Sequence, residues 1–338
     1  MDRRVVDWSS DAASRSGATS YRRLRISAIR TIAVALAVWM GLSALKIALP
    51  CVQNGAAAVA DAKHQMAESR SLFDPADRRR IYAFGDSKML AGFQPRTFAA
   101  ALGEGANAFN FAIPGDQRFV DLLEAAIVAG NVPTYVFVQA LPSQARTASW
   151  WGVLNDDKRM IQIVFPFRAY VRDAIVFAFE ANGPSNFVRQ YRSNAEQVGQ
   201  LKSDHGYYFI RSQSLYPDNC LPDDYRLPTD RPNDAYPRRV DVESEEFVRL
   251  VQLAETYDFE IVVVPVAYRK GEFAPPPGED REMIATLRPF DRIRVLGPPY
   301  LLYEPSAFSD PVHLNMSGAE RYTREIAALF RTMMTAGL

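Results

Sequence analysis

The sequence contains few cysteines and few histidines. Its 338 residues include two cysteines, Cys51 and Cys220, which excludes a disulfide-stapled scaffold and a zinc site built on cysteine. The three histidines, His64, His205 and His313, lie far apart, so a helical His-x-x-x-His metal motif is absent from the sequence. We therefore expect a protein without a metal site or a cofactor.

The chain also has no excess of either charge. Lys plus Arg and Asp plus Glu both total 39, so the overall charge does not favour a nucleic-acid partner. The distribution is uneven, because residues 1–30 hold seven Arg and three Asp. Hydrophobic residues make up 48% of the chain, which is typical of a globular protein.

The longest apolar stretch is residues 31–52, TIAVALAVWMGLSALKIALPCV, in which Lys46 is the single charge. As a helix this stretch would reach roughly 33 Å, enough to cross a hydrocarbon core of about 30 Å. The basic flank before it predicts that the N-terminus stays cytoplasmic and that the rest of the chain is exported. A cleaved signal peptide and a buried core helix are the alternatives, and the long polar leader favours an uncleaved anchor.

The composition changes along the chain and predicts four segments. We expect a disordered basic leader over residues 1–30, a transmembrane anchor over 31–52, a helical stalk over 53–80 and a globular domain over 81–338. Residues 145–240 are rich in aromatic residues, Arg, Asp and Pro, and we interpret them as an insertion within this domain.

Short apolar runs alternate with amphipathic segments after residue 81, which predicts an α/β fold with a mostly parallel sheet. The expected strands are Ile81–Gly85, Ala106–Ala112, Thr134–Ala140, Phe259–Val266 and Arg292–Leu296. Apolar residues at helical spacing predict helices over Asp121–Ala129, Val242–Tyr257 and Ser317–Met334.

Three short motifs lie beside these elements. Gly85-Asp86-Ser87 follows the first strand, and a glycine turn at Gly115 follows the second. The carboxyl edge of an open α/β sheet is where such folds place their sites. Asp310 and His313 precede the last helix at a spacing that lets the carboxylate bind one ring nitrogen while the other faces a serine. Each motif alone is equally typical of a turn or a helix cap.

Taken together, the three motifs resemble those of the SGNH (GDSL-like) hydrolase superfamily. The resemblance covers about residues 81–335, except the insertion, and implies a three-layer α/β/α sandwich with a flavodoxin-like strand order. It implies that Ser87 is the nucleophile, His313 the general base and Asp310 the residue that orients the base. The N–H groups of Ser87 and Gly115 would form the oxyanion hole.

The sequence departs from this superfamily after the third strand. A Gly-x-Asn-Asp block is usual there, and its Asn donates to the oxyanion. Here residues 138–144 read VQALPSQ, which leaves Gln139, Ser143 and Gln144 as the alternative donors. Removing one oxyanion donor costs about 10²–10³ in rate, so this position bears directly on catalysis.

A single N-terminal anchor before an exported domain of this type resembles bacterial envelope acyltransferases, such as alginate O-acetylation proteins. That resemblance implies a serine O-acyltransferase in the cytoplasmic membrane, with its catalytic domain in the periplasm. The acceptor would be an exported or cell-envelope polysaccharide, and a multi-spanning membrane partner would supply the acyl group. A membrane-tethered esterase and a non-catalytic assembly protein on the same fold are the alternatives.

Overall fold

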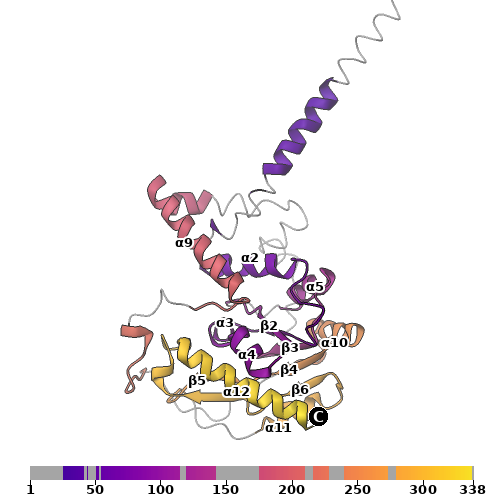
Figure 1. Ribbon diagram of the computed structural model, residues 1–338, viewed down its shortest axis with the longest axis vertical. Coiled ribbons are helices and arrows are strands. Elements are labelled where there is room, and N and C mark those ends of the chain that lie inside the picture. The colour runs from indigo at the N-terminus through magenta and orange to yellow at the C-terminus, as the bar shows by residue number, and fades with distance from the viewer. Residues whose placement is uncertain are drawn as a thin grey trace, which may run out of the picture.

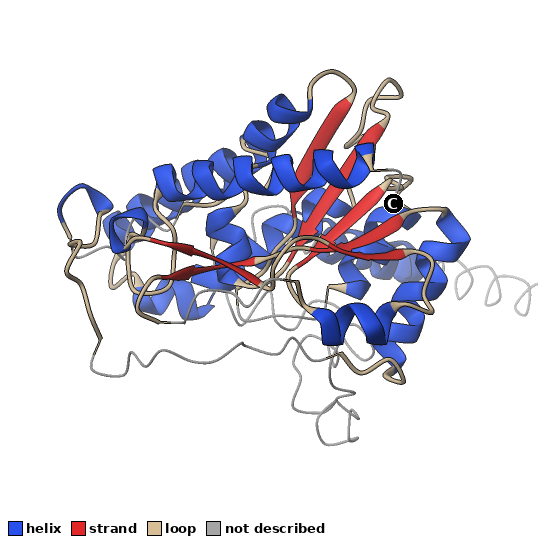
Figure 2. Cartoon of the chain, turned by 90° about the horizontal axis from the view of Figure 1, so that it is seen from below, coloured by secondary structure: helices blue, strands red, loops and turns tan. Residues whose placement is uncertain are grey.

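The computed structural model describes residues 26–41, 44, 51–52, 55–114, 119–141, 175–209, 216–227, 240–272 and 279–336. The domain is α/β, with a central sheet of five parallel strands in the order β2-β1-β3-β4-β6 (Figures 1 and 2). Its strands are β1 (Arg79–Phe84), β2 (Ala106–Asn110), β3 (Tyr135–Val138), β4 (Glu260–Val263) and β6 (Ile293–Val295). Each of the five expected apolar runs thus contributes a strand to this sheet, although the strand of the run Phe259–Val266 is shorter than predicted.

Helices cover the central sheet. Those before the insertion are α2 (Gly55–Ala67), α3 (Ser87–Gly92), α4 (Pro95–Leu102) and α5 (Val120–Val128). Those after it are α10 (Glu245–Tyr257), α11 (Arg281–Leu287) and α12 (Met316–Thr335). The three helices predicted from periodicity correspond to α5, α10 and α12, with bounds that differ by up to three residues.

Aromatic residues fill both interfaces between the sheet and its helices. Phe137 of β3 packs edge-on against Phe98 of α4 and Phe330 of α12, with ring centroids 5.3 and 5.1 Å apart. Side chains alternate across a strand, and Phe84 of β1 stacks instead on Phe119, at the start of α5, at 5.0 Å. Helices therefore lie on both faces of the sheet, as in a three-layer α/β/α sandwich.

A second, smaller sheet was not predicted. It pairs β5 (Val266–Arg269) with β7 (Tyr300–Tyr303) in parallel and lies beside α3. The apolar run at Phe259–Val266 therefore does not form one strand. Its first part is β4 of the central sheet, and its last residue begins β5 after a break at Val264 and Pro265.

The expected stalk over residues 53–80 requires correction, because α2 packs against the domain and does not stand apart from it. Ala62, Met66 and Ala67 are buried. Lys63 is buried as well, and its Nζ finds a hydrogen-bond acceptor in the Asn110 backbone oxygen at 2.7 Å. The charged end of the segment enters the central sheet, since β1 begins at Arg79.

Within the expected insertion, the described residues form a helix over residues 175–180, the long helix α9 (Pro184–Ser203) and a single-turn helix, η3 (Pro217–Asn219). The C-terminal end of α9 packs on α2, and Leu201 is its one buried residue. The aromatic pair Tyr216 and Tyr225 packs against the core, with ring centroids 5.8 Å apart.

A further helix over residues 26–41 projects from the domain (Figure 1) and exposes all of its side chains. Within the described ranges, no helix is both long enough and apolar enough to span a membrane. The predicted anchor, residues 31–52, falls only partly within those ranges. Of the expected disordered leader over residues 1–30, residues 1–25 lie outside them, and residues 26–30 are helical.

Candidate active site

The first motif forms a tight turn between β1 and α3. Asp86 caps α3 by accepting the backbone N–H of Lys88 at 2.8 Å, which leaves Ser87 as the first residue of the helix. Ser87 is partly exposed, whereas the helix buries Met89 and Leu90. The turn thus places Ser87 just beyond the carboxyl end of β1, which lies between β2 and β3 in the sheet.

Only glycine fits at position 85, because there is no room for a side chain. A Cβ atom there would lie 2.7 Å from Met89 Cβ and 2.8 Å from Gln139 Oε1. Real Cβ atoms do not approach other atoms so closely. The Gly85 carbonyl also accepts the N–H of Ile113 at 3.0 Å, so the serine turn is fixed to the segment that follows β2.

The third motif forms a hydrogen-bonded pair. His313 Nδ1 lies 2.7 Å from Asp310 Oδ2, and the side chains of both residues are only about 15% exposed. The other carboxylate oxygen, Oδ1, accepts the backbone N–H groups of Val312 and His313, both at 2.8 Å. The carboxylate is therefore held in one orientation by the loop that carries the histidine.

This arrangement sets the ionisation of Asp310. Burial alone would raise its pKa, but the hydrogen bond from His313, the two backbone N–H groups and the charge of the ring together lower it. An ionised carboxylate can only accept a hydrogen bond, so Nδ1 carries the hydrogen, and in the neutral ring the lone pair is then on His313 Nε2. Nε2 is buried and has no hydrogen-bond partner among the described residues.

The loop that carries His313 is anchored at both ends. Asn315 caps α12 by accepting the N–H of Gly318, and its amide donates to the Ser306 carbonyl at 2.8 Å. On the other side, the His313 carbonyl accepts the N–H of Ser309 at 2.9 Å. These hydrogen bonds fix the backbone on both sides of His313, and so hold its imidazole in place at the start of α12.

Helix packing brings this loop toward the serine helix. A Cβ atom at Gly92 of α3 would lie 3.5 Å from Leu314, the residue after His313. The Thr323 hydroxyl of α12 also donates to the Gly92 carbonyl at 3.1 Å. Gly92 is five residues after Ser87, about 7.5 Å along the helix axis. In the described structure, however, no hydrogen bond joins Ser87 to His313.

Gln139 lies beside the serine turn. It is the first residue after β3, only 6% exposed, and its Oε1 is the atom that a Cβ at Gly85 would meet. Its Nε2 is a buried donor without a hydrogen-bond partner in the described part of the chain. A buried amide usually satisfies its donors, so this one is available to a bound group.

The remaining oxyanion candidates lie outside the described residues. They are Gly115 from the second motif, and Ser143 and Gln144 from the segment after β3. Asn110, at the end of β2, is described and is fully buried. Its amide donates to the Met89 and Phe93 carbonyls, both at 2.9 Å, so it holds the second strand against the serine helix.

Lys88 is a residue near the site to which the sequence assigned no role. Its Nζ lies 3.7 Å from the centre of the Tyr268 ring in β5 and 4.0 Å from Glu272. Burial lowers its pKa, and nearby Arg269 adds to that effect, although Glu272 and Asp86 oppose it. Lys88 could not be identified from the sequence, because its contact with Tyr268 depends on the second sheet, which was not predicted.

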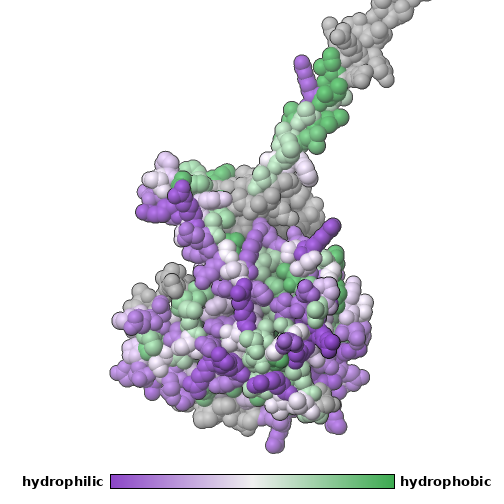
Figure 3. Space-filling view, in the orientation of Figure 1, coloured by the Kyte–Doolittle hydropathy of each residue, from purple (hydrophilic) through white to green (hydrophobic). Residues whose placement is uncertain are grey.

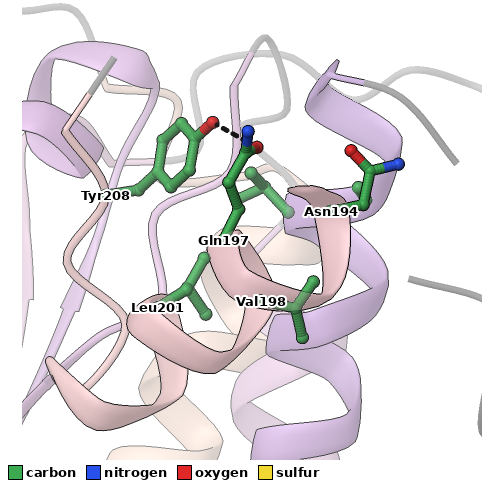
Figure 4. A pocket seen from close by; sticks show the side chains of 7 residues that line it. Asn194, Gln197, Val198, Leu201 and Tyr208 are labelled. Atoms are coloured by element: carbon green, nitrogen blue, oxygen red, sulfur yellow. Dashed lines mark hydrogen bonds between the residues drawn. The ribbon is translucent and has the colours of Figure 1, made fainter. Parts of the chain in front are cut away.

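A small pocket occurs between α2 and α9 (Figure 4). Ala58 and Val59 line one side, and Asn194, Gln197, Val198 and Leu201 line the other, with Tyr208 closing it. The Tyr208 hydroxyl donates to Gln197 Oε1 at 3.1 Å. None of these residues belongs to the three motifs. Among the described residues, no group of three or more His, Cys, Asp or Glu side chains is placed to hold a metal ion.

Comparison with protein-family models, with curated proteins and with solved structures finds no match for this chain.

Proposed function

We propose that this protein is a membrane-anchored extracytoplasmic serine acyltransferase that O-acetylates an exported or cell-envelope polysaccharide through an acyl-Ser87 intermediate. The observation that carries the proposal is the pair formed by Asp310 and His313. An oriented imidazole with its Nε2 lone pair free is the general base that a serine nucleophile requires.

The chemistry follows from the roles of three side chains. His313 Nε2 takes the Ser87 hydroxyl proton as Oγ bonds to the carbonyl carbon of the acyl donor. The tetrahedral intermediate collapses when its bond to the leaving group breaks, and that group receives the proton from His313. An acceptor hydroxyl then attacks the acyl-serine while His313 takes its proton. The new ester is released, and Ser87 Oγ receives the proton back from His313. Asp310 stabilises the imidazolium at both stages.

The intermediate carries a negative oxygen that needs donors. In this proposal they are the N–H groups of Ser87 and Gly115 and the side-chain amide of Gln139. The N–H at the first position of a helix has no acceptor within that helix. Gln139 replaces the Asn usual in the resembled superfamily, and its buried Nε2 beside Gly85 supports that role.

The proposed location depends on the N-terminal segment. Residues 31–52 would form a single-pass anchor in the cytoplasmic membrane, with the domain in the periplasm. The exposed apolar side chains of residues 26–41 support this, because such a surface requires an apolar environment. One span cannot carry an acyl group across the bilayer, so we also propose a multi-spanning membrane partner.

A non-catalytic role on the same fold is the second candidate. It is favoured by the missing hydrogen bond between Ser87 and His313. Catalytic hydrogen bonds are often long before substrate binds, so this observation does not outweigh the oriented base.

Intact-mass spectrometry tests these functions. The full chain in detergent is incubated with an activated acetyl ester, with and without polysaccharide fragments, beside Ser87→Ala and the control Ser203→Ala. The proposal predicts one acetyl group on the wild type and on Ser203→Ala, none on Ser87→Ala, and faster loss to the polysaccharide than to water. Loss to water alone would identify an esterase. No adduct on any variant would favour the non-catalytic role.

A further inference from the structure

The helical hairpin over residues 175–203 forms an apolar surface near the point where the N-terminal segment joins the domain. It consists of a helix over residues 175–180, a turn over 181–183, and α9. Phe177 in the first arm packs edge-on against Phe187 in the second, with ring centroids 5.1 Å apart. This contact joins the two arms at the end of the hairpin that lies farther from the central sheet (Figure 1).

The hairpin also contacts the end of the predicted anchor. Val52 is buried against Phe177 in a small cluster separate from the main core, with Phe187 and Tyr191 packed around it. The Asn194 amide donates to the Cys51 carbonyl at 3.1 Å. The last residues of the apolar segment are therefore fixed to the hairpin by an apolar contact and a hydrogen bond.

The end of the hairpin exposes several apolar side chains, with the charged residues Glu180 and Arg189 beside them. We define the apolar tip as Ile175, Val176, Phe179 and Val188, which are between 45% and 81% exposed, with Phe179 at 81%. Ile175 and Phe179 are four residues apart, so they lie on one face of their helix. Figure 3 shows apolar surface both here and on the helix over residues 26–41, at the same end of the molecule.

From this arrangement we infer that the apolar tip inserts into the interface of the lipid bilayer beside the anchor. The inference rests on the proposed transmembrane anchor and is independent of the proposed acyl-transfer chemistry. If residues 31–52 span the membrane, Val52 lies at its outer boundary. A headgroup layer is roughly 5–8 Å deep, so side chains packed around Val52 fall within it. Apolar and aromatic side chains bind at that depth.

A lipid surface is favoured over a protein partner by continuity with the anchor. Val52 ends the apolar segment, and it packs on Phe177, two residues before Phe179. Any bilayer around the anchor must therefore approach the tip, whatever other proteins are present. The contact would fix the domain at two points and so limit its rotation about a single anchor.

The test uses an environment-sensitive fluorophore on the full chain. Phe179→Cys is made in a background with Cys51→Ser and Cys220→Ser, labelled with the nitrobenzoxadiazole dye, and reconstituted into phosphatidylcholine–phosphatidylglycerol vesicles. The control is Ile284→Cys, also exposed, on α11 at the opposite end of the molecule. A lipid carrying a nitroxide near its headgroup serves as the quencher.

We expect the label at position 179 to emit at shorter wavelength in vesicles and to be quenched several-fold more than the label at 284. Equal, water-like signals at both positions in a chain that floats with the vesicles would overturn the inference and leave the anchor standing. A chain that does not float overturns both. Protection of position 179 only when membrane proteins are added would replace the lipid with a protein partner. Failure of acetylation at Ser87 would not alter any of these results.

Discussion

His313 Nδ1 and Asp310 Oδ2 lie 2.7 Å apart, and the other oxygen of the same carboxylate accepts two backbone N–H groups of the loop. The carboxylate therefore has no freedom to turn away from the ring. A histidine held in this way keeps one tautomer, with its basic nitrogen at Nε2, and that is the state in which it can accept a proton from a serine.

Asp310→Asn should lower turnover of an activated acetyl ester roughly 10²–10⁴-fold, because an amide can stabilise the wrong tautomer and cannot stabilise the imidazolium. Steady-state kinetics on the full chain measures the effect. Asp280→Asn, a helix cap on α11, is the matched control and should retain full turnover. Equal activity of the two variants would remove Asp310 from the mechanism.

The stability of the protein should depend on Asp310 in acid. Its pKa is lowered in the folded state from 3.8, so its ionised form contributes stability at pH values above 3.8. This contribution is lost as the pH falls through the folded value. Urea unfolding between pH 3 and 7 should therefore give a gap between wild type and Asp310→Asn that narrows toward pH 3. A constant gap would show that the charge of Asp310 does not stabilise the fold.

Gln139→Met should lower turnover about 10²–10³-fold if the amide stabilises the oxyanion. It should leave the free energy of unfolding unchanged or raise it, because the donor that is removed has no hydrogen-bond partner in the described structure. Kinetics and urea unfolding on the same sample separate these effects. A less stable protein with unchanged turnover would identify Gln139 as a structural residue instead.

Lys63→Met should change how stability depends on alkaline pH. Burial lowers the pKa of Lys63 well below its usual 10.5, so the unfolded chain binds more protons than the folded one in that interval. The free energy of unfolding of the wild type should rise with pH up to 10.5, by at most about 1.4 kcal/mol per unit, and the variant should lose this rise.

The comparison is made by urea unfolding at pH 8 and 10, with Lys202→Met as the control. Lys202 is exposed on α9, and its replacement should preserve the pH dependence of the wild type. If Lys63→Met and the wild type have the same pH dependence, the buried lysine is not neutral in the folded protein.

The central sheet was predictable because its strands contain short apolar runs, which are clearest in the YVFV of β3 and the EIVV of β4. The pair formed by Asp310 and His313 was predictable from its three-residue spacing. Both features depend on residues close together in the sequence, so the local pattern was sufficient to predict them.

Features that depend on distant contacts could not be predicted. The segment that forms the Ala-rich helix α2 was interpreted as part of a stalk that ends in the charged residues 77–80. Its burial depends on Asn110, which comes 47 residues later. Similarly, β5 finds its partner in β7, and Gln139 is placed beside Gly85 only by the packing of neighbouring strands.

Labelling of the full chain with a serine-reactive fluorophosphonate, followed by peptide mass spectrometry, tests whether His313 activates Ser87. We predict a single modified serine, Ser87, with labelling abolished in Ser87→Ala and slowed at least a hundredfold in His313→Ala. Labelling of other serines at the same rate, or equal rates in wild type and His313→Ala, would contradict it, because Ser87 would then not be activated by His313.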